Sequence, residues 1–157
     1  MIKAIDRVDS LTRLEDIGSD RDSPVLLDKN ERTVPYPETI YRELLQTLTP
    51  TELIKYPDQL ALYKKLSNFL ELEIEHLLLT NGADSGLKSC FEAFVEPGDE
   101  IVCLNPTYAM IMVYAQIFGS KVHQVGYNEN LELDLDLLFD CITTRTKIVI
   151  LPNPNQP

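Results

Sequence analysis

Apolar residues along the second half of the chain alternate between strand-like runs and helical spacing. An apolar run at residues 77–79 ends at a turn, and apolar residues then recur at Leu87, Cys90, Phe91 and Phe94, as on one helical face. The pattern further predicts strands at 101–104, 121–125 and 147–151, and helices at 108–118 and 134–141. Strands that alternate with helices are typical of an open, mainly parallel sheet with helices on its faces. The predicted fold class is therefore α/β, with a sheet that begins at residues 77–79.

The first half of the chain predicts helices joined by polar segments. Helical patterns cover 37–47, 51–55 and 59–72, and a short apolar run at 25–27 predicts a strand. Three residues of the first helix are expected to point inward: Ile40, Leu44 and Leu45. A residue before proline is kept from helical backbone angles, so Tyr56, which precedes Pro57, is expected on extended chain.

The turn after the run at 77–79 is a candidate anion site. It consists of Asn81, Gly82, Ala83 and Asp84, so no bulky side chain blocks the first backbone amides of the following helix. Those amides have no acceptor within their own helix, and the helix dipole favours negative charge there. A phosphate could therefore bind at this turn, although an ordinary turn without a ligand explains the same spacing.

Composition and charge narrow the classes of function. Of the 157 residues, 44% are apolar, which suffices for a packed core, and the net charge is −11. A nucleic-acid partner is not expected, because neutralising phosphates requires clustered Lys and Arg. The N-terminus lacks a hydrophobic signal core, and the longest nearly apolar run, 109–118, is half of the roughly 20 residues in a membrane helix. We expect a cytoplasmic protein that binds neither membranes nor nucleic acid.

The cysteines show neither a metal-binding nor a disulfide pattern. Cys90, Cys103 and Cys141 are odd in number and widely spaced. Each lies among apolar residues, which favours three buried free thiols in a reducing compartment.

The end of the chain is rich in turn-forming residues. The last predicted strand is followed directly by Pro152-Asn153-Pro154-Asn155-Gln156-Pro157. Open α/β sheets bind ligands at the carboxyl ends of their strands, so the chain stops where a site loop is expected. The sequence is therefore predicted to be the N-terminal part of a longer protein.

Six separate segments together carry a resemblance to one enzyme family. They are Leu27-Asp28-Lys29-Asn30-Glu31, Tyr56-Pro57-Asp58, Thr80-Asn81-Gly82-Ala83-Asp84-Ser85-Gly86, Pro97-Gly98-Asp99, Asn105-Pro106-Thr107-Tyr108 and the last six residues. In this order the sequence resembles the class I/II, fold-type-I pyridoxal-phosphate aminotransferases, and looks most like histidinol-phosphate aminotransferase and its relatives. The resemblance covers the chain from about Val25 and corresponds to the first part of a family member.

The resemblance implies a three-layer α/β/α domain with a mainly parallel sheet, here truncated. Residues 1–48 would form an N-terminal segment that belongs to the small domain or dimer arm. Residues 49–157 would form the N-terminal portion of the large domain, which binds pyridoxal 5'-phosphate.

The resemblance also implies residues that bind this cofactor. Gly82, Ala83 and Asp84 match the cofactor-phosphate loop, in which the amides of the last two bind the phosphate. Tyr108 matches an aromatic residue that stacks on the pyridine ring. Tyr56 matches a tyrosine that reaches the cofactor phosphate of the neighbouring subunit, which implies a homodimer. A tyrosine with a purely structural role is the alternative at both positions.

Other matches are accompanied by departures from the family pattern. Asn30 and Glu31 match a substrate-side segment, with a plain polar loop as the alternative. Gln156 stands where the family has an Asn whose amide binds the ring hydroxyl oxygen; Gln offers the same donor, or Asn155 replaces it. The Asp84 carboxylate would repel a phosphate, so it is expected to turn toward backbone or neighbouring groups.

Transamination needs a lysine that holds the cofactor, an acid at its ring nitrogen and an arginine for the substrate carboxylate. In relatives these residues lie beyond the position of Pro157. Lys88 is nearest to the phosphate loop, but it lies off the apolar helical face and is expected to be exposed and non-catalytic. The resemblance thus implies transfer of an amino group from an amino acid, or a histidinol-phosphate-like amine, to a 2-oxo acid. The 157 residues alone are expected to be inactive.

Three other functions stay open at this point. Decarboxylases and C–S lyases of the same fold type share these N-terminal motifs, and a non-catalytic binding or remnant module could keep the fold. A nicotinamide-binding domain is less favoured, because the turn at 81–86 lacks the Gly-x-Gly-x-x-Gly spacing.

Overall fold

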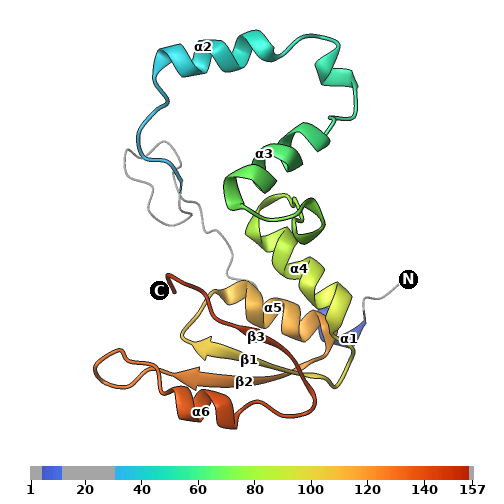
Figure 1. Cartoon of the computed structure of the whole chain (residues 1–157). Coiled ribbons are helices and arrows are strands. Elements are labelled where there is room, and N and C mark those ends of the chain that lie inside the picture. The colour runs from blue at the N-terminus through green and yellow to red at the C-terminus, as the bar shows by residue number, and fades with distance from the viewer. Residues whose placement is uncertain (1–4, 12–30, 156–157) are drawn as a thin grey trace. The chain divides into compact units, whose positions relative to one another are not determined.

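The computed structural model of the chain describes residues 5–11 and 31–155. These residues belong to two compact units: a sheet unit of residues 5–11 and 78–155, and a helical unit of residues 31–77 (Figure 1). The predicted strand at 25–27 lies outside the described residues. The division of the whole protein after residue 48 stays a prediction.

The helical unit contains two α-helices and two single 3₁₀ turns. They are α2 (Glu38–Thr47), η1 (Glu52–Ile54), α3 (Leu60–Leu70) and η2 (Ile74–His76). Pro37 directly precedes α2, because its fixed φ suits the start of a helix and its missing N–H is not needed there. Tyr56 lies outside regular structure and is fully exposed, in line with the effect of Pro57.

The apolar face of α2 is not buried. We expected Ile40, Leu44 and Leu45 to point inward, but they are 43%, 54% and 49% exposed, so this prediction is wrong. Helical periodicity marks which residues share a face, whereas burial requires a second surface that packs against that face.

Three parallel strands form the sheet of the other unit, in the order β2-β1-β3. The strands are β1 (Glu100–Asn105), β2 (Lys121–Gly126) and β3 (Thr146–Ile150). α5 (Ala109–Phe118) connects β1 to β2, and α6 (Leu135–Asp140) connects β2 to β3. The predicted parallel α/β fold is confirmed, since helical crossovers rather than hairpins join β1 to β2 and β2 to β3.

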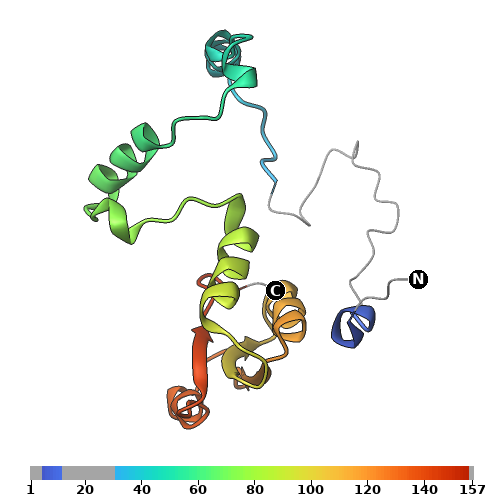
Figure 2. The same ribbon diagram turned by 90° about the vertical axis from the view of Figure 1, so that its right-hand side faces the viewer.

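Helices cover both faces of this sheet. α4 (Gly82–Phe94) and α5 lie on one face and α6 lies on the other (Figures 1 and 2). The core between β1, α4 and α5 consists of Phe91, Val95, Ile101, Cys103, Ile111, Tyr114 and Ala115. The core toward α6 consists of Val102, Leu104, Val125 and Leu138. Because successive residues of a strand point to opposite faces, the apolar run of β1 supplies both cores and produces the three layers.

The ends of two helices follow from local sequence signals. Asp134 caps α6, because its side chain accepts a 3.0 Å hydrogen bond from the Leu137 amide. α5 ends at Gly119, which has a φ of 70°, a conformation that favours glycine. Both boundaries agree with the sequence prediction to within one residue.

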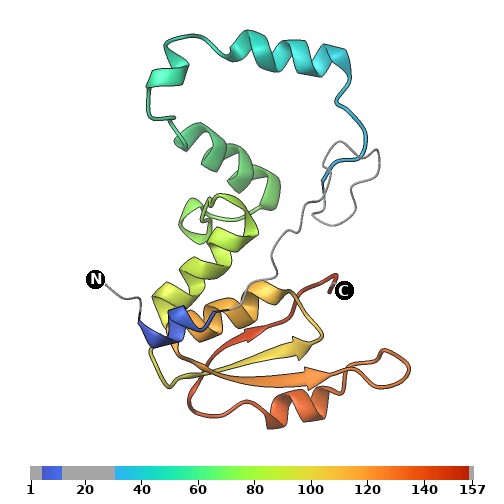
Figure 3. The ribbon, with the colours of Figure 1, turned by 180° about the vertical axis from the view of Figure 1, so that it is seen from behind.

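The first described residues pack on α5. The short helix α1 (Asp6–Asp9) lies beside the C-terminal end of α5 (Figure 3). Arg7 Nε donates a 2.7 Å hydrogen bond to the Ile117 carbonyl, and Gln116 Nε2 donates to the Arg7 carbonyl and to Ser10 Oγ, at 3.2 and 3.0 Å. These contacts join segments more than 100 residues apart in the sequence.

Residues 77–79 do not form a strand, contrary to the sequence prediction. They form a connection between η2 and α4, and Leu78 is 70% exposed. A strand needs a hydrogen-bonded neighbour, and within the described residues the sheet pairs only β2, β1 and β3. On the following helix Phe91 is fully buried, whereas Phe94 is 64% exposed.

The cysteines differ in burial. Cys103 is buried in β1, Cys141 is half-buried and Cys90 is exposed, so the expectation of three buried thiols holds only for Cys103. Burial raises the pKa of the Cys103 thiol, because the thiolate would lose its hydration.

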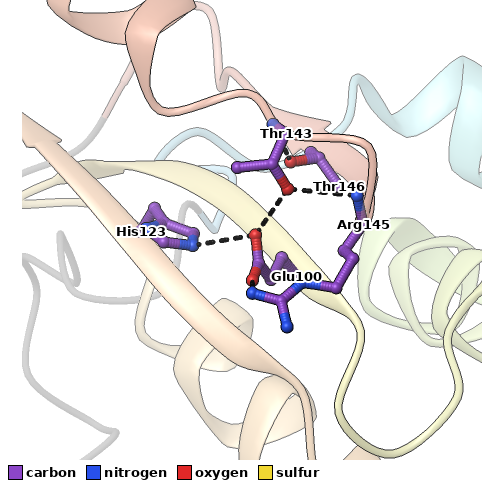
Figure 4. Close-up of polar contacts among 5 residues, drawn as sticks. All are labelled: Glu100, His123, Thr143, Arg145 and Thr146. Atoms are coloured by element: carbon purple, nitrogen blue, oxygen red, sulfur yellow. Dashed lines mark hydrogen bonds and ion pairs between the residues drawn. The ribbon is translucent and has the colours of Figure 1, made fainter.

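A buried carboxylate lies at the amino end of the sheet. Glu100, the first residue of β1, is 1% exposed. Its carboxylate lies among the side chains of Thr143, Arg145 and His123 (Figure 4). It accepts a 2.7 Å hydrogen bond from Thr143 Oγ1 and pairs with the Arg145 guanidinium. His123 Nε2 lies 3.2 Å from Glu100 Oε2, at ion-pair distance but without hydrogen-bond alignment. The Thr143 hydrogen bond and the charge of Arg145 lower the pKa of Glu100, and they outweigh the opposing effect of burial.

Candidate functional site

The carboxyl ends of the three strands meet at one edge of the sheet, because the strands are parallel. The residues that follow them are joined by the side chain of Asn155. Its Nδ2 donates to the Pro106 carbonyl at 2.8 Å and to the Tyr127 hydroxyl at 3.1 Å, and its Oδ1 accepts from Thr107 Oγ1 at 3.0 Å. The loops after β1 and β2 are thereby fixed to the segment after β3, at the edge where open α/β sheets bind ligands.

The turn into α4 has the backbone geometry that the candidate anion site requires. Gly82 has a φ of 81°, and its amide donates to the Thr80 carbonyl at 2.8 Å. The Ala83 and Asp84 amides donate to no acceptor in the described part of the chain, and the side chain of Asn81 does not cap the helix. Two adjacent donors at the positive end of a helix of 13 residues therefore have no acceptor among the described residues.

Asp84 and Tyr108 are brought together by the fold. Tyr108 precedes the first residue of α5, and its hydroxyl donates a 2.7 Å hydrogen bond to Asp84 Oδ1 in the first turn of α4. Tyr108 is 47% exposed, so it is not a buried core tyrosine. The Asp84 carboxylate turns to a neighbouring group, as expected, and this direction reduces its repulsion of an anion at the amides.

The turn fits a phosphate-bearing group. A Cβ placed on Gly82 would meet no atom within 4 Å, so the space beside the turn is open. The free amides supply hydrogen-bond donors, and the one acidic side chain of the first turn is held by Tyr108. Tyr108 in turn supplies a half-exposed aromatic ring beside the same turn. This combination suits a ligand that carries both a phosphate and a flat ring.

A cavity of about 450 Å³ opens beside Asn155 at the same edge. Residues that follow β1 and β2 line it, among them Pro106, Tyr127 and Leu131. A volume of this size is within the range of small-molecule sites.

Lys88 is paired with a carboxylate and offers no free amine to the site. Its Nζ pairs with Glu92 Oε1 at 2.9 Å on the outer surface of α4, where both side chains are 51% exposed. The hydrogen bond to Glu92 raises the pKa of Lys88, which keeps the amine protonated and non-nucleophilic.

The other predicted site residues lie elsewhere in the chain. Tyr56 and Glu31 belong to the helical unit, and their predicted roles stay predictions. Asn30 and Gln156 lie outside the described residues.

The sequence prediction missed Thr107 and Tyr127 as parts of the site edge. They lie three and two residues after the predicted strands at 101–104 and 121–125, so their position near carboxyl strand ends is a signal that the sequence contains. For their partner Asn155 the sequence predicts only a role as a substitute for Gln156, because the hydrogen bonds of a side chain do not follow from its position in the sequence.

Metal and membrane sites are not found in the parts of the chain that the structure describes. No group of three or more His, Cys, Asp or Glu side chains among residues 5–11 and 31–155 could hold a metal ion. Within the same ranges, none of the helices combines the length and apolar character needed to cross a membrane.

Comparison with known proteins identifies the family. The family model for aminotransferase class I and II matches residues 22–157. The histidinol-phosphate aminotransferase of Christiangramia forsetii is 36% identical over 123 residues, which are 76% of this chain and 35% of that protein. The chain therefore spans about a third of the length of this curated relative.

Two solved aminotransferases share the fold. A mutant of Thermus thermophilus aspartate aminotransferase gives a TM-score of 0.76 at 23% identity, over 100% of this chain and 43% of its own. A PLP-dependent aminotransferase from Streptococcus suis gives a TM-score of 0.59 at 28% identity, over 78% of this chain and 33% of its own. Since the family match covers all but the first 21 residues, the chain belongs to the class I and II aminotransferases.

Proposed function

We propose that the complete protein is an aminotransferase that depends on pyridoxal 5'-phosphate. It transfers an amino group from an amino acid, or from a histidinol-phosphate-like amine, to a 2-oxo acid. The observation that carries the proposal is the meeting of Tyr108, Asp84 and the open amides of α4 at one turn. The family match and the likeness to the Streptococcus suis enzyme support the choice of cofactor.

In this proposal the turn into α4 holds the cofactor phosphate. The Ala83 and Asp84 amides donate to its oxygens, and Gly82 provides a turn that leaves them accessible. When bound, the cofactor supplies an electron sink for the carbon that bears the transferred nitrogen. Tyr108, held by Asp84, would stack on the cofactor ring and keep water away from it.

Further residues complete the proposed site in the assembled protein. Tyr56 reaches the cofactor phosphate of the neighbouring subunit of a homodimer, and Asn30 and Glu31 lie on the substrate side. Gln156 would donate to the ring hydroxyl oxygen. The lysine that holds the cofactor is assigned to the part of the protein outside this chain, so the 157 residues alone would be inactive. The complete protein would act in the cytoplasm, without a membrane or nucleic-acid partner.

The test is an assay of the protein expressed from its complete reading frame. With pyridoxal 5'-phosphate, an amino donor and 2-oxoglutarate, we expect a keto product and glutamate in equal amounts, with ping-pong kinetics. Histidinol phosphate and several amino acids serve as alternative donors. Release of carbon dioxide or of a thiol would instead identify a decarboxylase or a C–S lyase. Failure to bind the cofactor would favour a non-catalytic module.

A pair of variants tests the assignment of the phosphate to α4. Ala83→Pro removes one of the two proposed amide donors in the first helical turn, where proline is tolerated. Ala83→Ser keeps that amide and changes the side chain by one atom. We expect weaker cofactor binding for Ala83→Pro than for Ala83→Ser, measured by equilibrium dialysis. Equal affinities would show that the phosphate binds elsewhere.

A further inference from the structure

The side chain of Asn155 connects three parts of the chain that are far apart in sequence. It bonds to Pro106 and Thr107, 49 and 48 residues away, and to Tyr127, 28 residues away. These partners follow β1 and β2, whereas Asn155 itself follows β3. One amide thus spans the carboxyl ends of all strands of the described sheet.

The amide group of Asn155 is fully used as a donor. A carboxamide has two N–H donors, and here they go to the Pro106 carbonyl and the Tyr127 hydroxyl. Its oxygen accepts from Thr107. A ligand could gain a donor from Asn155 only if one of these bonds broke. The residue is therefore suited to hold protein segments rather than to bind the cofactor ring.

The bonds of Asn155 fix segments next to proposed cofactor contacts. Thr107 directly precedes Tyr108, whose ring is proposed to face the pyridine, and Asn155 directly precedes Gln156 in the sequence. Asn155, Thr107 and Tyr127 are each half-buried, so water competes less for their hydrogen bonds than at an exposed site. A shift of this amide would move Thr107 and, with it, the backbone of Tyr108.

We propose that Asn155 is a positioning residue that acts with Tyr127. Its amide holds the backbone before Tyr108 and the backbone before Gln156 in one fixed arrangement, and Tyr127 supports the amide from the end of β2. The inference rests on the proposed function, because Tyr108 and Gln156 matter here as cofactor contacts. It assigns roles to Asn155 and Tyr127 that differ from ligand binding.

The experiment compares Asn155→Asp with Asn153→Asp in the complete protein. Both variants add one negative charge to the same segment, but Asn153 is exposed and has no part in this network. Asn155→Asp replaces both N–H donors by an oxygen that faces the Pro106 carbonyl. We expect Asn155→Asp to lower the affinity for pyridoxal 5'-phosphate by about tenfold, the effect of losing one or two hydrogen bonds. Asn153→Asp is expected to change it less than about twofold.

A spectroscopic measurement separates positioning from a general loss of stability. We expect the pH midpoint of the visible absorption of the bound cofactor to move in Asn155→Asp and to stay constant in Asn153→Asp. A residue with only a structural role would lower the temperature of unfolding without moving this midpoint. If Asn155→Asp fails to fold, Thr107→Val and Tyr127→Phe each remove one bond of the network and undergo the same measurements.

A double-mutant cycle tests the link between Asn155 and Tyr127. Tyr127→Phe is expected to lower cofactor affinity in the unaltered protein but to add little once Asn155 has been replaced. Additive effects would overturn the joint role. Suppose that the unaltered protein binds the cofactor and catalyses transamination. If Asn155→Asp and Asn153→Asp then have the same cofactor affinity and the same pH midpoint, this inference alone is overturned. Absence of cofactor binding in the unaltered protein would overturn the proposed function and this inference with it.

Discussion

The Tyr108 hydroxyl donates a 2.7 Å hydrogen bond to the Asp84 carboxylate, which ties the start of α5 to the first turn of α4 across 24 residues of sequence. The bond directs the one carboxylate of that turn toward a tyrosine. The helix N-terminus thereby keeps its attraction for an anion although an acidic residue lies within it.

Removal of this hydrogen bond should have a small and specific cost. Tyr108→Phe keeps the aromatic ring and is expected to lower the free energy of unfolding by about 1 kcal/mol, because the bond is partly exposed. Urea unfolding measures the change. Tyr41→Phe, at a half-exposed tyrosine of α2, is the matched control and should change stability by less than about 0.5 kcal/mol. Equal effects of the two variants would contradict a contribution from the Asp84 bond.

The two phenylalanines at the C-terminal end of α4 should differ widely in their effect on stability. Phe91 is fully buried and packs against Tyr114 and Phe118, with ring centroids 6.0 and 5.7 Å away. Phe91→Ala should lower the free energy of unfolding by about 3–5 kcal/mol, through lost burial and the cavity that remains. Phe94→Ala should change it far less, since that ring is 64% exposed. If the two variants lost similar amounts of unfolding free energy in urea, the assignment of Phe91 to the core and of Phe94 to the surface would be refuted.

Gly82 is expected to tolerate Asn better than Ala. Its φ of 81° is costly for a residue with a Cβ, although the space around it is open. Gly82→Ala should therefore lower the free energy of unfolding by about 1–2 kcal/mol through backbone strain alone. Asn adopts positive φ more readily, so Gly82→Asn should lose less. Thermal unfolding of both variants tests the order, and a larger loss for Asn would refute the strain argument.

Because of Glu100, the free energy of unfolding should depend on pH in the acid range. Its pKa is lower in the folded chain than in the unfolded chain, where it is about 4.3. The stabilisation is thus fully present above about pH 4.3 and is lost as the pH falls through the folded pKa. Glu100→Gln removes this titration, so its unfolding free energy should fall less steeply between neutral and acid pH. Glu96→Gln, at an exposed glutamate, should keep the original slope.

From α4 to β3 the sequence predicts the order of the elements, because the helix ends there have local causes. Asp134 caps α6, and Gly119 ends α5 by its positive φ. Each effect involves residues within a few positions of one another, so spacing and residue type predict it. Spacing and residue type likewise predict the proposed phosphate turn at Gly82.

Burial and pairing were predicted less well, because they depend on distant partners. Residues 77–79 have the composition of a strand but have no paired neighbour among the described residues. Leu44 and Phe94 lie on apolar helical faces and are 54% and 64% exposed. An apolar pattern states which residues can be buried, whereas the packing of other segments decides which of them are.

By itself the sequence determined the parallel α/β class, the boundaries of α5 and α6, and the small-residue turn at the start of α4. The tertiary structure decided that Tyr108 holds Asp84, that Glu100 is buried beside Arg145, and that Asn155 joins the ends of three strands. The physical reason is the distance over which each interaction acts along the sequence. Backbone preferences act between near neighbours, whereas a side-chain hydrogen bond needs two groups within about 3 Å of each other. Only the folded chain brings residues that are 24 to 49 positions apart to that distance.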